Sequence, residues 1–182
     1  QELLLVTVHP TTRSEKSVII EISELLTALD HFAQATIVFT GVNADPGYKY
    51  VNDEITKFVL REPKRRVMHN SLGQKNYLNL MRVADVVIGN SSSGIIEAPA
   101  LHVPTVNIGT RQDGRLRADS IIDCIFGHNE IRTAIEAALS PSWKARCLTT
   151  TSKYGSGDTA NSIADTLKNT KLTTQKIFFD NF

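Results

Sequence analysis

Cysteine is scarce in this sequence. The 182 residues include two cysteines, Cys124 and Cys147. They form neither a CxxC pair nor a Cys/His cluster at the spacing of a zinc site. We therefore expect no bound metal and two free thiols. Free thiols are typical of the cytoplasm, where reducing conditions keep cysteines unpaired, so a cytoplasmic location is predicted.

Long apolar runs, a signal-peptide pattern and a large net charge are also missing. No apolar run approaches the ~20 residues of a membrane-spanning helix, and no basic start leads into an apolar stretch with a cleavage site. The formal net charge of +1 gives no argument for binding nucleic acid or an acidic membrane surface. GxGxxG does not follow the first predicted strand, so we expect no redox cofactor, and indeed no cofactor at all.

The residues that are present favour one α/β domain. Hydrophobic residues make up 41% of the chain and charged residues 21%, which is enough for a well-packed core. Continuous apolar runs predict strands at 3–9, 35–41, 65–69, 85–90 and 104–109. Apolar residues at three- and four-residue spacing predict helices at 16–31, 47–60, 73–84, 92–101, 128–139 and 158–168. This alternation indicates a Rossmann-like, doubly wound parallel sheet covered on both faces.

A run of three serines follows the predicted strand 85–90 and opens the next helix. Ligands of parallel α/β sheets collect at the carboxyl ends of the strands. A helix start offers unpaired N–H groups and the positive end of the helix dipole, and serine hydroxyls add further donors. We also expect Gly94 to let a ligand approach closely. An ordinary N-cap would need only one serine, so the pattern favours a phosphate site.

Other polar residues are predicted at the same edge of the sheet. Glu97 lies one turn into the helix, where it either compensates the dipole or accepts hydrogen bonds from ribose hydroxyls. Arg111 follows the strand 104–109, where a guanidinium would meet a phosphate or a sugar. His9 ends the first strand and has either a structural or a chemical role. Asn43 lies in the turn after the second strand.

A known family shares these motifs. Residues 88–115, IGNSSSGIIEAPALHVPTVNIGTRQDGR, with VTVHP upstream and KYGSGDTANSIADTLK downstream, resemble the C-terminal half of UDP-N-acetylglucosamine 2-epimerases. The resemblance is closest to the hydrolysing type, which releases N-acetylmannosamine and UDP for sialic acid synthesis. It implies one half of a glycosyltransferase-B type fold, in which two Rossmann-like domains face a cleft and the C-terminal domain grips UDP.

The resemblance also implies a set of site residues. His9 corresponds to a family histidine that is implicated in catalysis. The serines would hold the diphosphate, Glu97 the ribose hydroxyls, and the backbone near Ser71 the uracil. The residues that would bind the UDP-sugar are Asn43, Ser71, Leu72, Ser91, Ser92, Glu97 and Arg111.

We predict that residues 1–170 form the UDP-binding domain and that the tail, 171–182, docks on an N-terminal domain absent from this chain. The family's acid and base residues lie in that domain, so the isolated chain is expected to be inactive. The longer protein is expected to be a homo-oligomer. A non-hydrolysing enzyme is less favoured, because HPTTR at 9–13 departs from that group's His-Arg-Arg-Glu-Asn run.

Three alternatives stay open at this point. The first is an epimerase of a 2,4-diacetamido-trideoxy UDP-sugar, because the sugar contacts that would separate it come largely from the missing half. The second is the donor-binding domain of a UDP-sugar glycosyltransferase, which would share the fold and the UDP site. The third is a non-catalytic module that binds nucleotide sugars.

Overall fold

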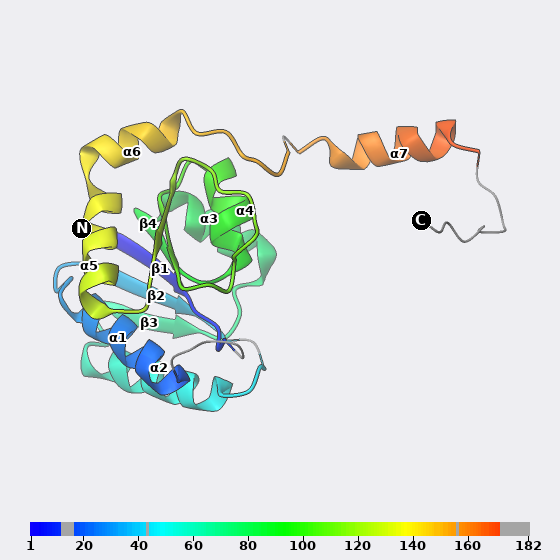
Figure 1. Ribbon diagram of the computed structural model, residues 1–182. Helices are drawn as coiled ribbons and strands as arrows, with labels where there is room; N and C mark the ends of the chain where they lie inside the picture. Colours follow the sequence, from blue (N-terminus) through cyan, green and yellow to red (C-terminus); the bar gives the residue numbers. More distant parts are fainter. Residues whose placement is uncertain (12–16, 43, 156, 172–182) are drawn as a thin grey trace, which may run out of the picture.

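Six parallel strands form one sheet in the order β3-β2-β1-β4-β5-β6 (Figure 1). The computed structural model describes residues 1–11, 17–42, 44–155 and 157–171. The strands are β1 (Leu3–Thr7), β2 (Thr36–Thr40), β3 (Arg66–His69), β4 (Val86–Gly89), β5 (Thr105–Ile108) and β6 (Ile121–Cys124). This order confirms the Rossmann-like, doubly wound sheet that the sequence predicts.

Seven helices are assigned in the described part of the chain. They are α1 (Val18–Asp30), α2 (Tyr48–Arg61), α3 (Gly73–Val83), α4 (Ser92–Ala100), α5 (His128–Leu139), α6 (Pro141–Leu148) and α7 (Thr159–Asn169). Each of the six helices predicted from periodicity is confirmed within about two residues at either end. None of the helices in the described ranges is both long and apolar enough to cross a membrane.

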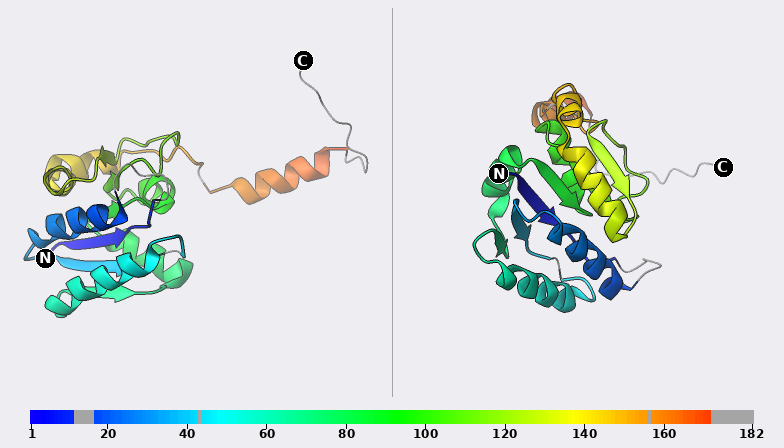
Figure 2. Two further views of the ribbon diagram at one scale, coloured as in Figure 1. Left: turned by 60° about the horizontal axis from the view of Figure 1, so that its bottom comes forward. Right: turned by 90° about the vertical axis from the view of Figure 1, so that its left-hand side faces the viewer.

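The last helix, α7, stands apart from the sheet. Figures 1 and 2 show it projecting away from the rest of the domain, and none of its residues is buried. Ile163 and Leu167 are 54% and 55% exposed. Residues 172–182 of the phenylalanine-rich tail, whose docking the sequence predicts, lie outside the described residues, so that expectation stays a prediction.

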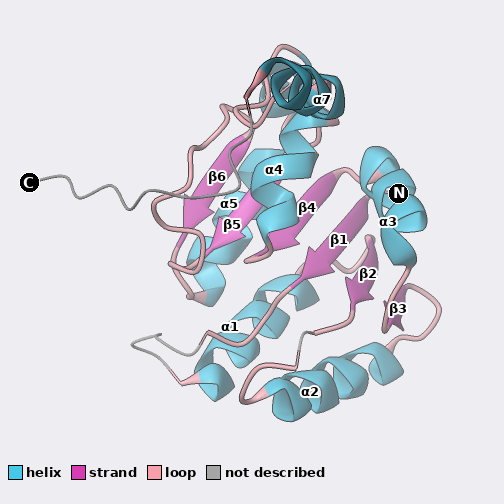
Figure 3. Ribbon diagram, turned by 90° about the vertical axis from the view of Figure 1, so that its right-hand side faces the viewer, coloured by secondary structure: helices cyan, strands magenta, loops and turns pink. Residues whose placement is uncertain are grey.

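Strand residues alternate between two apolar layers. Leu4 and Val6 of β1 pack into one cluster with the buried faces of α1, α2 and α5. Leu5 of β1 and Val87 of β4 pack on the other face, against residues of α3 and α4. Because both faces are covered, the strands read as continuous apolar runs. Figure 3 shows that the arrowheads of the strands point to a common edge, the carboxyl edge.

The sequence did not predict β6. Its residues, Ile121–Cys124, are mostly half-buried, and Asp123 interrupts the apolar run. β6 pairs with β5 alone, at the border of the sheet. An edge strand needs less apolar surface than a central one, so its apolar signal is weak.

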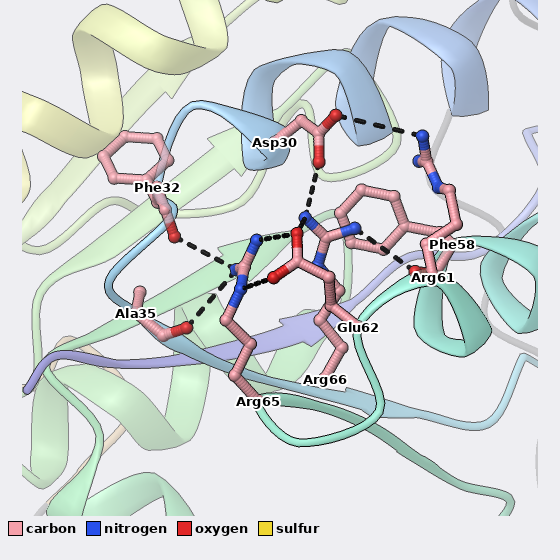
Figure 4. A network of polar contacts seen from close by, with 8 residues as sticks. All are labelled: Asp30, Phe32, Ala35, Phe58, Arg61, Glu62, Arg65 and Arg66. Atoms are coloured by element: carbon pink, nitrogen blue, oxygen red, sulfur yellow. Dashed lines mark hydrogen bonds and ion pairs between the residues drawn. The ribbon is translucent and has the colours of Figure 1, made fainter.

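A buried arginine fixes the opposite border of the sheet (Figure 4). Arg66 of β3 is 1% exposed, and its guanidinium lies 3.7 Å from the centre of the Phe58 ring. It donates hydrogen bonds to the Phe58 carbonyl at 3.2 Å and to the carboxylates of Asp30 and Glu62. Through these contacts one side chain connects the C-terminal ends of α1 and α2 to β3, at the amino edge.

Candidate functional site

The chain order of the strands reverses between β1 and β4, which are hydrogen-bonded neighbours. Thr7 of β1 lies opposite Gly89 of β4 at the carboxyl end of this pair. In open α/β sheets such a switch point leaves a crevice that binds ligands. His9 and Asn90 follow the two strands, so the predicted histidine and the predicted serine run are side by side.

Asn90 connects the elements at the switch point. It is fully buried; its Oδ1 accepts a hydrogen bond from the His9 backbone N–H at 2.7 Å, and its Nδ2 donates to the His9 carbonyl at 2.8 Å. The Asn90 backbone carbonyl accepts from the Arg111 guanidinium at 3.1 Å and from the Gln112 amide at 2.8 Å. Asn90 therefore holds the ends of β1 and β4 and the loop after β5 in one arrangement.

Sequence reasoning missed Asn90 and Gln112. A polar residue directly between a buried strand and the serine run was the available signal for Asn90. Gln112, 2% exposed, gave no such signal, because it follows a strand within an otherwise polar loop.

The serine run opens α4. Ser91 is the N-cap, and its Oγ accepts a hydrogen bond from the Ser93 backbone N–H at 3.4 Å. Ser92 and Ser93 occupy the first two helical positions, and all three serines are half-buried. Within the described residues the Ser92 hydroxyl has no hydrogen-bond partner. One serine thus makes the cap, while the Ser92 hydroxyl stays available beside the N–H groups of the first turn.

The expectation for Gly94 is wrong. A Cβ at this position would lie 2.9 Å from Thr105 Cγ2 and 3.7 Å from Val87 Cγ1. Gly94 therefore faces the sheet rather than a ligand. The absence of a side chain allows α4 to pack closely on β4 and β5.

Glu97 lies beyond the first turn of α4, so it is not placed to compensate the positive end of the helix dipole. The residue is half-buried, and its Oε2 is buried without a hydrogen-bond partner in the described residues. A buried carboxylate oxygen without a donor is costly. The residue is only half-buried, so a rotation of the carboxylate would bring this oxygen within reach of ligand hydroxyl groups, which would supply the missing donors.

The other predicted residues are distributed along the same edge. His9 and Arg111 are half-buried. Ser71 and Leu72 follow β3 at the start of α3, where the Ser71 Oγ accepts from the Gly73 backbone N–H at 3.2 Å. Asn43 lies outside the described residues.

Comparison with known proteins shows which family this chain belongs to. The family model described as UDP-N-acetylglucosamine 2-epimerase matches residues 1–168. A GDP/UDP-N,N'-diacetylbacillosamine 2-epimerase (hydrolyzing) from Campylobacter jejuni is 38% identical over 183 residues, which is 99% of this chain and 47% of that relative. The polysialic acid biosynthesis protein P7 of Escherichia coli is 41% identical over 128 residues, 70% of this chain and 32% of that protein.

Solved structures agree on the fold. The UDP-GlcNAc 2-epimerase from Neisseria meningitidis, bound to UDP-GlcNAc, matches with a TM-score of 0.68 and 14% identity, over 93% of this chain and 44% of that chain. At this identity the likeness shows the fold: one Rossmann-like half of a glycosyltransferase-B type arrangement. The chain spans about half the length of the diacetylbacillosamine epimerase it matches. By the match over residues 1–168, this chain belongs to the UDP-N-acetylglucosamine 2-epimerase family.

Proposed function

We propose that this chain is the UDP-binding half of a hydrolysing UDP-N-acetylglucosamine 2-epimerase, which acts in the cytoplasm on a route to sialic acid. The observation that carries the proposal is the start of α4. Serine hydroxyls and the backbone N–H groups of the first turn lie there at the switch point between β1 and β4, in a chain that the family model matches over residues 1–168. The whole protein would produce N-acetylmannosamine and UDP.

The diphosphate would bind at the amino end of α4, where the dipole and the first-turn N–H groups favour an anion. Ser91 and Ser92 add hydroxyl groups there. Arg111 donates through Nη1 to the Asn90 carbonyl at 3.1 Å. This contact holds the guanidinium at the edge of the sheet, and its remaining N–H donors can bind phosphate oxygens.

The nucleoside would extend from the diphosphate along the same edge. Glu97, whose Oε2 has no hydrogen-bond partner among the residues that the structure describes, is assigned to the ribose hydroxyls, and this missing partner supports the assignment. Ser71 and Leu72 at the start of α3 are assigned to the uracil, which the exposed position of Ser71 supports. Asn43 is assigned to the nucleotide-sugar site from the family resemblance alone.

The reaction begins with loss of the proton at C2 of the sugar, after which UDP leaves by elimination and a 2-acetamidoglucal forms. Water then adds to the opposite face of this product to give N-acetylmannosamine. Negative charge gathers on the departing diphosphate, and the start of α4, its serines and Arg111 would stabilise that charge. His9 lies next to this position and is assigned a catalytic role.

The groups that handle protons at C2 are assigned to the other half of the longer protein. We therefore expect the 182-residue chain to bind UDP without turning over the nucleotide sugar. Release of N-acetylmannosamine by the isolated chain would contradict the assignment of these groups to the other half.

A second substrate has specific support. The relative that is 38% identical is named for N,N'-diacetylbacillosamine, a 2,4-diacetamido sugar. Product analysis of the longer protein with both UDP-sugars distinguishes the two candidates. The preferred substrate will show the higher kcat/KM, and formation of a glycoside instead of a free sugar would favour a transferase.

UDP binding by calorimetry tests the central proposal. Wild-type chain is expected to bind UDP, and the Ser92→Ala, Arg111→Ala double variant to bind about 30-fold more weakly or worse, because one neutral and one charge-assisted contact are lost. Arg115→Ala removes an exposed arginine of the same loop and should leave binding unchanged. A wild-type chain without affinity for UDP, or a double variant that binds as tightly as wild type, refutes the proposal.

A further inference from the structure

A chain of hydroxyl groups runs from β2 to the start of α4. The Thr40 and Thr7 hydroxyls are 2.6 Å apart, and the Thr7 hydroxyl is 3.4 Å from the Tyr77 hydroxyl. Tyr77 of α3 lies 2.7 Å from the Ser93 Oγ, which lies 3.0 Å from the Ser91 Oγ. This chain connects the ends of β1 and β2 to the first turn of α4 through a single tyrosine.

The direction of these hydrogen bonds follows from the number of protons. A serine hydroxyl has one proton to donate and two lone pairs to accept with. The Ser93 hydroxyl donates to the Ser91 Oγ. It has no second proton for the Tyr77 oxygen, so in their shared hydrogen bond Tyr77 donates and Ser93 accepts.

The Ser91 hydroxyl is the last group in this series of hydrogen-bonded hydroxyls. Its Oγ accepts from the Ser93 hydroxyl at 3.0 Å and from the Ser93 backbone N–H at 3.4 Å. Both lone pairs of the Ser91 oxygen are then used, so the Ser91 proton is free to donate to a group outside this series of hydroxyls. Ser91 is the half-buried N-cap of α4, beside the N–H groups of the first turn. An outward O–H donor there adds to the positive character of the helix start.

We propose that Tyr77 is a positioning residue for the anion site: by donating to Ser93 it keeps the Ser91 hydroxyl directed toward the diphosphate. This inference rests on the proposed function, in which the amino end of α4 holds the diphosphate of UDP. Without the Tyr77 hydroxyl, the Ser93 hydroxyl loses the partner that fixes its rotation, and it no longer always donates to Ser91. The Ser91 oxygen then has a free lone pair, its hydroxyl can rotate, and the outward donor is lost for part of the time.

The phenolic oxygen can be removed with little change in packing. The Tyr77 ring is half-buried and packs against the apolar cluster that includes Leu5 and Met81. Phenylalanine would keep these contacts, so Tyr77→Phe isolates the role of the hydroxyl group.

The test compares a ligand that has phosphates with one that lacks them. UDP binding is measured by calorimetry and uridine binding by NMR titration, for wild type, Tyr77→Phe, Ser93→Ala and the double variant. We expect Tyr77→Phe to raise the Kd for UDP about fivefold to tenfold, the effect of one weakened hydrogen bond to an anion, and to leave the Kd for uridine unchanged within about twofold. In the Ser93→Ala background the same change should add less than about twofold, because the two hydroxyls act in series.

Tyr154→Phe is the matched control. It removes another tyrosine hydroxyl, one that donates to the Leu116 carbonyl at 3.2 Å, and should not change either Kd. Thermal unfolding checks that each variant is folded. If Tyr77→Phe fails to fold, Ser93→Ala alone carries the test, and the same phosphate-dependent loss is expected from it.

The outcomes separate this inference from the proposed function. If wild type and Tyr77→Phe bind UDP equally well, the role of Tyr77 is overturned and the proposed function still holds. Equal losses for UDP and uridine also overturn it, because the hydroxyl would then act on the fold or on the uracil site. A wild-type chain that does not bind UDP overturns both.

Discussion

Replacement of Asn90 tests the arrangement of the whole switch point. The side chain is fully buried and pairs with both backbone groups of His9, at 2.7 Å and 2.8 Å. Asn90→Ala removes both hydrogen bonds. Asn90→Asp keeps the shape and the acceptor but replaces the donor to the His9 carbonyl with a carboxylate oxygen.

The expected cost of Asn90→Ala follows from the groups that lose a partner. Each neutral hydrogen bond contributes about 1 kcal/mol, and an unpaired backbone group that stays partly buried costs about 1–3 kcal/mol. Because His9 is half-buried and water can reach it in part, we expect a loss of about 2–4 kcal/mol. For a chain of 182 residues this corresponds to a decrease in Tm of about 5–15 °C.

Asn90→Asp should be worse than Asn90→Ala at neutral pH, because it buries a charge that faces a carbonyl oxygen. The neutral carboxyl could donate to that carbonyl, so the pKa of the new carboxyl should be higher in the folded than in the unfolded protein. Stability of this variant should then be greatest at low pH. It should fall as the pH rises from about 4, the unfolded value, through the raised folded value.

Urea denaturation of wild type and both variants at pH 5 and pH 8 measures these effects. Asn79→Ala and Asn79→Asp alter an exposed asparagine of α3 and serve as controls that should differ little from wild type. An Asn90→Asp variant as stable as wild type at pH 8 would refute the reasoning, as would an Asn90→Ala variant within about 0.5 kcal/mol of wild type.

Three further predictions concern stability and reactivity. Arg66→Ala should lower the free energy of unfolding in urea by about 2–4 kcal/mol, because it removes a buried guanidinium that contacts two helices; a loss below about 0.5 kcal/mol would contradict this role. Burial alone would raise the pKa of the Asp85 carboxyl, but the Lys144 ammonium and a backbone N–H hold it below its usual range. The resulting stability is present above the ordinary pKa of about 4 and is lost as the pH falls through the lower folded value. Lys144→Met should therefore differ most from wild type near pH 7 and least once the pH lies below the lowered folded pKa, and a difference independent of pH in urea titrations would argue against the pair. Burial raises the pKa of the Cys124 thiol to about 12, so roughly one thiol in ten thousand is ionised at pH 8. Labelling of Cys124 by a thiol reagent should therefore be slow in the native chain and rapid in guanidinium. Fast labelling of the native chain at Cys124 would be inconsistent with that pKa.

The amino-acid sequence by itself determined the order of most helices and strands, and it determined the family. Apolar runs located β1, β2, β3, β4 and β5, and helical periodicity located six helices, because these signals depend on neighbours within a few residues. The serine run and the residues around it pointed to the candidate anion site, since helix starts and strand ends carry local signatures. β6 was missed because an edge strand needs little apolar surface.

Only the tertiary structure decided how the site is held together. Asn90 pairs with His9 across 81 positions in sequence, and Tyr77 reaches Ser93 from a different helix. Gly94 was assigned to the ligand, and the structure turned it toward Thr105 instead. The physical reason is the same for all three residues. The sequence gives the chemistry of each side chain, but its hydrogen-bond partner and its orientation depend on how distant helices and strands pack. The order of the strands in the sheet sets this packing.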